Sequence, residues 1–406
     1  MAKKIKLAYS GSNFALLPPI SDVVSLFGGP ASTPAMIRMI ARHRKLDKPP
    51  AGLDKKTLNK AFDTGVSSRV ADKITDFMID VNSDCKYLSI DELVRMLQEN
   101  TAERGNGPVW LASIQGLKEG LQRSAPDKPL LRRTISFIEG RIEVEAHIFR
   151  VAQQADVPLY IKLLLDAVKN HTLINYSNAE KSLSILPMLR VDGECCWLLS
   201  SEEGETIEVF CLQFYLDFYF SLLVCIELDV IEDSFVASES CLASELYDGL
   251  LSEVFTKSID NEKRKINQAF ENLLDHWRES RSLSWSQIAE YIPDPEPMRS
   301  RIPCKRARSP EKIKETKNRR LHEWRNDTMP TDDQLERFIN NLIPEKDGQF
   351  YHFVIAKLVL GWGRLLHRFL EKKTKYINHQ DILNHFKCYS EYRIWMQSRL
   401  PFKQPE

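Results

Sequence analysis

The sequence predicts a mainly α-helical protein with many helices arranged in two or three domains. The chain has 406 residues, which is long for a single core. Its apolar fraction of 43% is ordinary for a globular protein. Apolar residues recur at helical spacing along most of the chain, behind residues that favour helix N-termini. We therefore expect an N-terminal helical domain at 1–125, an acidic central helical domain at 126–281 and a basic C-terminal helical domain at 282–406.

In the N-terminal domain, residues that cap helices precede several amphipathic runs. These runs are PAMIRMIARHRK, KKTLNKAF, RVADKITDFMIDV and LVRMLQ. Their expected starts are Thr33 with Pro34, Asp54, Ser67 or Ser68, and the capping box of Ser89 with Glu92.

The central domain is predicted to hold helices at 132–154, after Pro158, at 213–230 and at 241–257. Asp192-Gly193 and Glu203-Gly204 are typical of turns, so we expect a small β-hairpin near 187–211. The apolar stretch 209–226 has 18 residues, near the lower limit for a membrane span. It contains polar residues and has acidic flanks, which favours a buried core helix.

The C-terminal domain follows a helix expected at 262–281. Ser284 with Gln287 and Thr331 with Gln334 predict two capped helices. The proline-rich stretch 293–309 is a linker or loop, after which Ser309-Pro310 opens a helix reaching about Trp324. The end of the chain, 350–400, is predicted to be helical.

The net charge of zero hides a strong asymmetry. From Val191 to Thr256 there is no Lys or Arg, while fifteen Asp and Glu occur. Between Arg299 and Arg325 eleven Lys and Arg stand against three acids. A basic segment of this kind attracts phosphate, which favours contact with nucleic acid. Attraction between the two regions, within the fold or across an oligomer, is an alternative, and a solvated surface is a third.

The densest basic segment carries a family resemblance. LSWSQIAEYIP resembles the second helix of a helix-turn-helix unit, with Ile288 and Ala289 packing inward. The stretch that follows is similar to the second half of lambda-repressor-like (Xre-type) domains, so that 283–342 carries the match. It rests on Leu321, Trp324, Asn326, Asp327, Pro330, Leu335, Phe338 and Leu342.

This resemblance implies a recognition helix whose exposed side chains reach bases and phosphates in the major groove. It would place near DNA the residues Lys314, Lys317, Asn318, Arg319, Arg320, His322 and Arg325. In the family a tight turn joins the two central helices, whereas here roughly 20 residues with several prolines stand between them.

A weaker resemblance to the same half-domain lies at about 33–80. LDKKTLNKAFDTGVSSRVADKITDFM would place Leu58 and Phe62 inward and Asp63-Thr64-Gly65 in the turn. The residues exposed toward DNA would then be Lys55, Lys56, Asn59 and Lys60.

The sequence lacks the patterns of common catalytic sites. There is no GxxxxGK[ST], HExxH or GxSxG pattern, and Gly28-Gly29-Pro30 is too short for a dinucleotide fingerprint. His379, His385 and Cys388 offer at most a partial zinc ligand set. Cys195-Cys196 stands in an acidic, apolar stretch that does not favour a reactive thiolate. We expect no enzymatic activity, no cofactor and no metal.

The N-terminus is not typical of a secretory signal, and the 8 Cys include no CxxC pair. We therefore expect a cytoplasmic protein that does not enter a membrane. The leading hypothesis is a DNA-binding or nucleoprotein-associated protein of bacterial regulator type. The alternative is a non-enzymatic interaction or assembly subunit whose acidic centre docks a basic partner or its own oligomer.

Overall fold

The computed structural model describes most of the chain. The described residues are 17–29, 54–85, 131–152, 157–190, 201–236, 240–260, 267–294, 309–326, 328–344, 346–371 and 377–399, with single residues 34, 35, 38, 110, 113, 114, 117, 118 and 265. Among them the protein is helical and contains no strand, as the predicted fold class requires.

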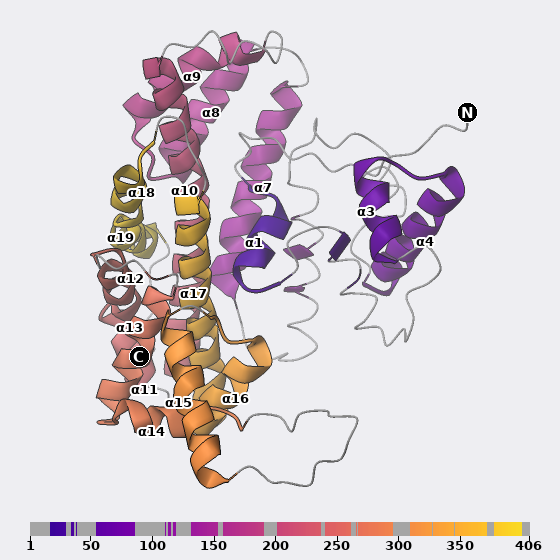
Figure 1. The fold of residues 1–406 in the computed structure, drawn as a ribbon. Helices are drawn as coiled ribbons and strands as arrows, with labels where there is room; N and C mark the ends of the chain where they lie inside the picture. Colours follow the sequence, from indigo (N-terminus) through magenta and orange to yellow (C-terminus); the bar gives the residue numbers. More distant parts are fainter. Residues whose placement is uncertain are drawn as a thin grey trace.

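The N-terminal half of the described chain contains two short and five long helices (Figure 1). Their bounds are α1 Ile20–Leu26, α3 Lys55–Asp63, α4 Ser68–Cys85, α7 Arg132–Ala152, α8 Val157–His171, α9 Tyr176–Arg190 and α10 Ser201–Val236. The second half contains α11 Ser240–Tyr247, α12 Leu250–Asp260, α13 Gln268–Ser280, α14 Trp285–Glu290, α15 Pro310–Asn326, α16 Asp332–Leu342, α17 Lys346–Glu371, α18 His379–Phe386 and α19 Tyr389–Arg399.

Several helix starts lie where the sequence predicts them. Asp54 accepts a hydrogen bond from the Thr57 backbone N–H at 3.0 Å and caps α3. Ser284 and Thr331 begin α14 and α16, each with a complete capping box. The start predicted at Ser89 lies outside the described residues.

The β-hairpin expected near 187–211 is not confirmed. Residues 187–190 end α9, and 201–211 begin α10. The predicted turn at Glu203-Gly204 lies within α10, while 191–200 fall outside the described residues. Helix α10 therefore starts twelve residues before the helix predicted at 213–230, and its first turn carries Glu202 and Glu203, where the helix dipole favours negative charge.

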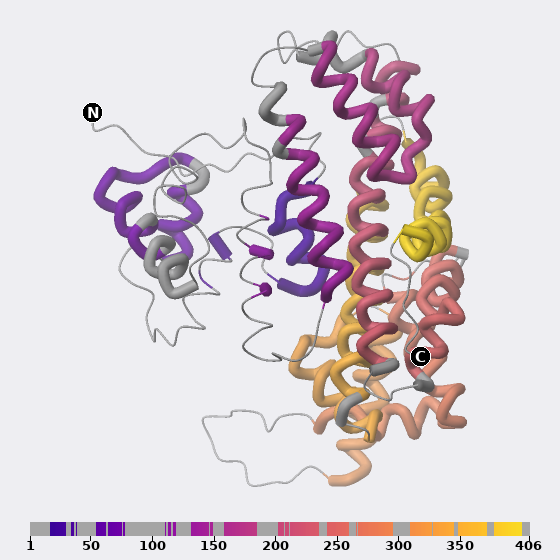
Figure 2. Tube along the Cα trace, turned by 180° about the vertical axis from the view of Figure 1, so that it is seen from behind, coloured from indigo at the N-terminus to yellow at the C-terminus, as the bar shows by residue number. Residues whose placement is uncertain are grey.

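Helix α10 is the central core helix of the bundle. Figures 1 and 2 show it running through the middle beside α17, with α7 on one side and α19 on the other. By length and composition alone it is the one described helix that could cross a membrane, over Glu202–Ser234. Neighbouring helices bury 76% of its most apolar window. A helix that is apolar on all sides is expected at such a buried place.

Three carboxylates of α10 are buried, and two of them fasten α7. The Arg141 Nη2 donates to Asp217 Oδ2 at 2.6 Å, with both side chains almost fully buried. Asp229 accepts from the backbone N–H groups of Arg133 at 2.8 Å and Thr134 at 2.9 Å. These two N–H groups lie in the first turn of α7, where backbone N–H groups have no carbonyl partner within the helix. Asp229 thus caps α7 from a neighbouring helix.

The third buried carboxylate joins α10 to α19. Glu227 is fully buried, and it accepts from Tyr389 Oη at 2.9 Å and Arg393 Nε at 3.2 Å. Burial raises the pKa of the Glu227 carboxyl to about 7, although the Arg393 guanidinium and the Tyr389 hydroxyl favour the ionised form.

A cluster of aromatic rings holds α10, α12, α17 and α19 together. Trp362 of α17 is fully buried and stacks on Phe255 of α12 with ring centroids 4.2 Å apart. Phe220 of α10 lies 5.2 Å from the same indole, and Tyr389 of α19 lies 5.4 Å from it. Phe386 of α18 lies 5.0 Å from it as well. Trp362 therefore contacts rings from four other helices, and its removal would leave a large cavity.

The main core does not stop at the predicted domain boundary after residue 281. One apolar cluster includes Leu17, Trp277, Ile288 and Met396, which come from all three expected domains. The division into three domains stays a prediction. Helices α3 and α4 lie beside the bundle in both views, and their buried residues do not belong to this cluster (Figures 1 and 2).

Candidate nucleic-acid interface

Helices α13 to α16 form the part of the bundle that carries the basic segment. The inward side of α15 bears Leu321 and Trp324, which are 3% and 2% exposed. Trp324 meets Phe338 of α16 edge to face, with ring centroids 5.6 Å apart. Ile288 and Ala289 of α14 are also buried. The apolar residues that carry the family resemblance thus face inward on these helices.

The opposite side of α15 faces solvent and is rich in cations. Lys312, Arg319 and His322 are exposed there, and Lys314 is exposed on the side of the helix that faces α14. Asn318 and Arg320 are half-buried. Since α15 is 17 residues long, its cations can spread over several turns of one surface.

The exposed cations of α15 have only weak acidic neighbours. Lys314 Nζ lies 3.9 Å from Glu290 Oε1, and Arg319 Nε lies 3.6 Å from Glu323 Oε1. Pairs this exposed contribute about 0–1 kcal/mol and are screened by salt. Within the described part of the chain no acid forms an ion pair with Arg320. These side chains are free to reorient toward a phosphate.

Lys317 is held against the protein instead. Its side chain is 17% exposed, and its Nζ binds Asp294 Oδ1 at 2.7 Å. The same ammonium donates to the Glu290 carbonyl oxygen at 3.1 Å. Lys317 therefore ties α15 to the end of α14 and to the beginning of the proline-rich stretch, whose residues 295–308 lie outside the described chain.

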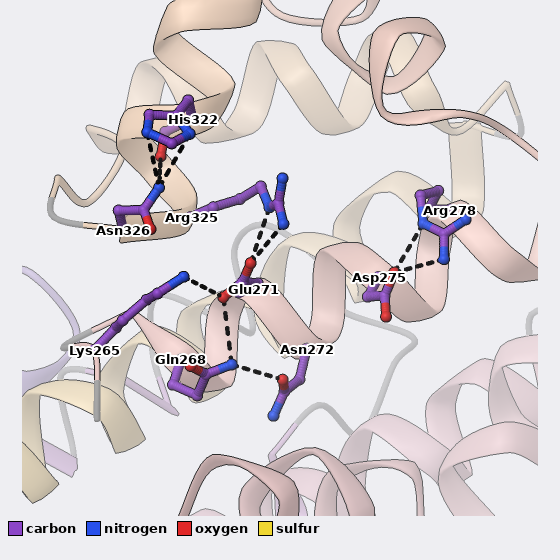
Figure 3. A network of polar contacts seen from close by, with 9 residues as sticks. All are labelled: Lys265, Gln268, Glu271, Asn272, Asp275, Arg278, His322, Arg325 and Asn326. Carbon is purple, nitrogen blue, oxygen red and sulfur yellow. Dashed lines mark hydrogen bonds and ion pairs between the residues drawn. The ribbon is translucent and has the colours of Figure 1, made fainter. Parts of the chain in front are cut away.

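Arg325 is also held within the protein (Figure 3). Its Nη2 and Nε donate to Glu271 Oε1 at 2.7 and 3.0 Å. Its guanidinium carbon lies 3.8 Å from the centre of the Trp285 ring. An arginine that is hydrogen-bonded and stacked in this way loses much of its freedom to reach another anion.

Between α14 and the first turns of α15 there is a groove of about 320 Å³. The residues that line it are Ser286, Ala289, Glu290, Pro310, Ile313, Lys314 and Lys317. The N-terminal half of α15 is consequently less closely packed than its C-terminal half, where Leu321 and Trp324 are buried.

Helix α3 presents a second basic surface. Lys55, Lys56, Asn59 and Lys60 are all exposed, as the weaker resemblance implies. Leu58 on the other side of the helix is fully buried. The Asp54 carboxylate is occupied by the Thr57 backbone and hydroxyl, and these bonds lower its pKa. Among the described residues no ion pair is found for these three lysines.

Two side chains that shape the α15 surface were not predicted as functional. Glu271 and Trp285 hold Arg325, yet they are 54 and 40 residues before it in the chain. An aromatic residue directly after the capping Ser284 was the only sequence signal for either of them.

The chemistry of a metal site is not visible in the described part of the chain. No group of three or more His, Cys, Asp or Glu there could hold a metal ion. Cys388 and His385 are both partly buried, and burial is the first cause that lowers the pKa of His385 and raises that of Cys388. Cys195-Cys196 lies outside the described residues.

Comparisons of the chain with protein-family models, with curated proteins and with solved structures find no match.

Proposed function

We propose that the protein binds nucleic acid, with duplex DNA as the preferred form, through the exposed cations of α15 and secondarily through those of α3. The observation that carries the proposal is the outward side of α15. There Lys312 and Arg319 are exposed, opposite the buried Leu321 and Trp324, while Lys314 is exposed at the groove that faces α14.

The physical basis is electrostatic. Cations that neutralise phosphates release condensed counterions, so affinity falls steeply as salt rises. An α-helix fits the major groove of B-DNA, where its polar side chains can reach base edges. The resemblance to lambda-repressor-like domains supports α15 as the helix that would enter the groove. Lys317 and Arg325 have protein partners, so we assign them to holding α15 in place.

The test is fluorescence anisotropy with labelled duplex DNA, single-stranded DNA and RNA at several salt concentrations. Reversal of two charges, Arg319→Glu with Arg320→Glu, should weaken binding at least about tenfold and reduce the salt slope by about 2. The matched control is Lys162→Glu with Lys169→Glu on α8, where both lysines are exposed. It makes the same change in net charge at the other end of the bundle (Figure 1).

The control should retain nearly the wild-type affinity and slope. Circular dichroism of each variant establishes that the helices are intact. The proposal is wrong if the wild-type protein binds none of the three nucleic acids at low salt, or if both double variants weaken binding equally.

The alternative, an interaction or assembly subunit, has a distinct outcome in the same experiment. Loss of complex assembly in the Arg319/Arg320 variant with unchanged nucleic-acid affinity would favour it. Asp217, Glu227 and Asp229 are buried in pairs, so an acidic docking surface would have to use exposed acids such as Glu202 and Glu205.

A further inference from the structure

We propose that Arg325 is a positioning residue that fixes the direction of α15 by acting through Glu271 and Trp285. It does not itself contact nucleic acid. This inference rests on the proposed function, because it concerns how the contact helix is held. We call these three residues the α15 clamp.

The Arg325 guanidinium forms hydrogen bonds along one edge and stacks on an aromatic ring with one face. Two of its N–H groups donate to Glu271 Oε1, and its plane lies on the Trp285 ring. The side chain is 27% exposed. A planar guanidinium is suited to this combined hydrogen bonding and stacking, which the compact ammonium of lysine cannot reproduce.

Glu271 is itself held in place from the other side (Figure 3). Its second oxygen, Oε2, accepts from Lys265 Nζ at 3.2 Å and from Gln268 Nε2 at 3.3 Å. The side chain is 13% exposed and lies in the first turn of α13, where the helix dipole favours a negative charge. The carboxylate is therefore a fixed anchor for Arg325.

Trp285 joins the third helix to the same point. It is the first residue of α14, and the Arg278 guanidinium carbon of α13 lies 5.3 Å from its ring centre. A backbone contact adds to the clamp, since Asn267 Nδ2 donates to the Trp324 carbonyl oxygen at 3.1 Å. The clamp thus connects α13, α14 and the C-terminal end of α15.

The clamp lies at the C-terminal end of α15, far from the cations near the start of the helix, so a small rotation at the clamp moves these cations by a larger distance. Lys312 lies thirteen residues before Arg325, which corresponds to about 20 Å along the helix. A tilt of about 10° at the clamp would move the start of α15 by about 3 Å, the length of a hydrogen bond. The groove between α14 and the first turns of α15 leaves room for such a tilt.

The sharpest test is Glu271→Gln, because it separates positioning from charge. Removal of an acid near a DNA-binding surface should leave affinity unchanged or raise it if only Coulomb attraction matters. If the clamp positions α15, the same variant should bind duplex DNA about tenfold more weakly, a change of about 1.4 kcal/mol. Glu336→Gln is the matched control, since Glu336 is exposed on the neighbouring α16 and the charge change is identical.

Arg325→Lys gives a second measurement. A residue that served only as a phosphate-contacting cation would retain most of its effect as lysine. The clamp predicts weaker binding for Arg325→Lys, similar to that of Glu271→Gln. The double variant should lose no more than either single one, because both changes open the same contact.

Amide hydrogen exchange of the unbound variants keeps the inference testable without DNA. Glu271→Gln should accelerate exchange in α15 relative to wild type and to Glu336→Gln, while exchange in α10 is unchanged. Equal exchange in α15, or unaltered or tighter DNA binding by Glu271→Gln, overturns the clamp. Absence of DNA binding by the wild-type protein overturns the proposed function instead, and the exchange experiment then decides on the clamp alone.

Discussion

The buried carboxylate of Glu227 makes the stability of the bundle depend on pH in an unusual direction. Burial raises its pKa in the folded protein to about 7, against an ordinary value of 4.5. Between these two values the folded state binds more protons than the unfolded state does. The free energy of unfolding therefore falls as pH rises through this window and levels off above about pH 7.

Glu227→Gln removes this dependence. The amide oxygen can accept from Arg393, and the amide nitrogen can donate to the Tyr389 oxygen, so both hydrogen bonds retain partners. Any pH-independent effect of the substitution on the free energy of unfolding cancels when stabilities at two pH values are compared. Relative to wild type, the variant should gain about 3 kcal/mol of stability between pH 4.5 and pH 8, because one pKa unit corresponds to about 1.4 kcal/mol.

Urea unfolding followed by tryptophan fluorescence at pH 5, 6, 7 and 8 measures this difference. Glu202→Gln is a suitable control, since that side chain is 83% exposed at the start of the same helix. A difference between Glu227→Gln and wild type that stays constant from pH 5 to pH 8 would mean that the Glu227 carboxyl does not have a raised pKa in the folded protein.

Three further predictions concern other parts of the molecule. Burial lowers the pKa of His352 from its ordinary value of 6.5 to about 4, so the free energy of unfolding falls as pH drops from 6.5 toward 4. His352→Gln should reduce this loss of stability in the same urea experiment. Trp362→Ala should cost about 3–5 kcal/mol and leave helix content lower at 37 °C, as circular dichroism would record. Lys56→Glu with Lys60→Glu on α3 should weaken DNA binding by anisotropy without changing the melting temperature, because both side chains are exposed.

Local signals predicted most of the helix starts. The caps at Asp54, Ser284 and Thr331 depend on residues within three positions of each other, so the sequence alone contains the whole interaction. The hairpin expected near 187–211 depended on glycines that suggest turns. Gly204 is instead buried within α10, where the absence of a side chain is tolerated at a modest cost in helix propensity.

The candidate site was predictable only in part. Helical spacing separated Leu321 and Trp324 from the cations on the other side of α15, and it did the same for Leu58 on α3. It could not show that Lys317 and Arg325 have protein partners, because Asp294 and Glu271 lie 23 and 54 residues away in the chain. Whether a cation in a basic helix faces solvent or binds another part of the protein depends on residues that are distant in sequence.

The partners of the buried acids in the central region of the chain are also distant in sequence, so the sequence alone did not reveal them. Asp217 and Glu227 meet Arg141 and Arg393, which are 76 and 166 residues away. Each of these two buried acids pairs with one arginine, so the pairs leave the net charge of the remaining residues at zero. The exposed cations of α15 and α3 are therefore opposed by acids elsewhere on the molecule. The proposed attraction to DNA therefore depends on the local arrangement of these cations, whose field is screened within about 10 Å at 0.1 M salt. Binding through α15 and α3 should accordingly be short in range and strongly dependent on salt.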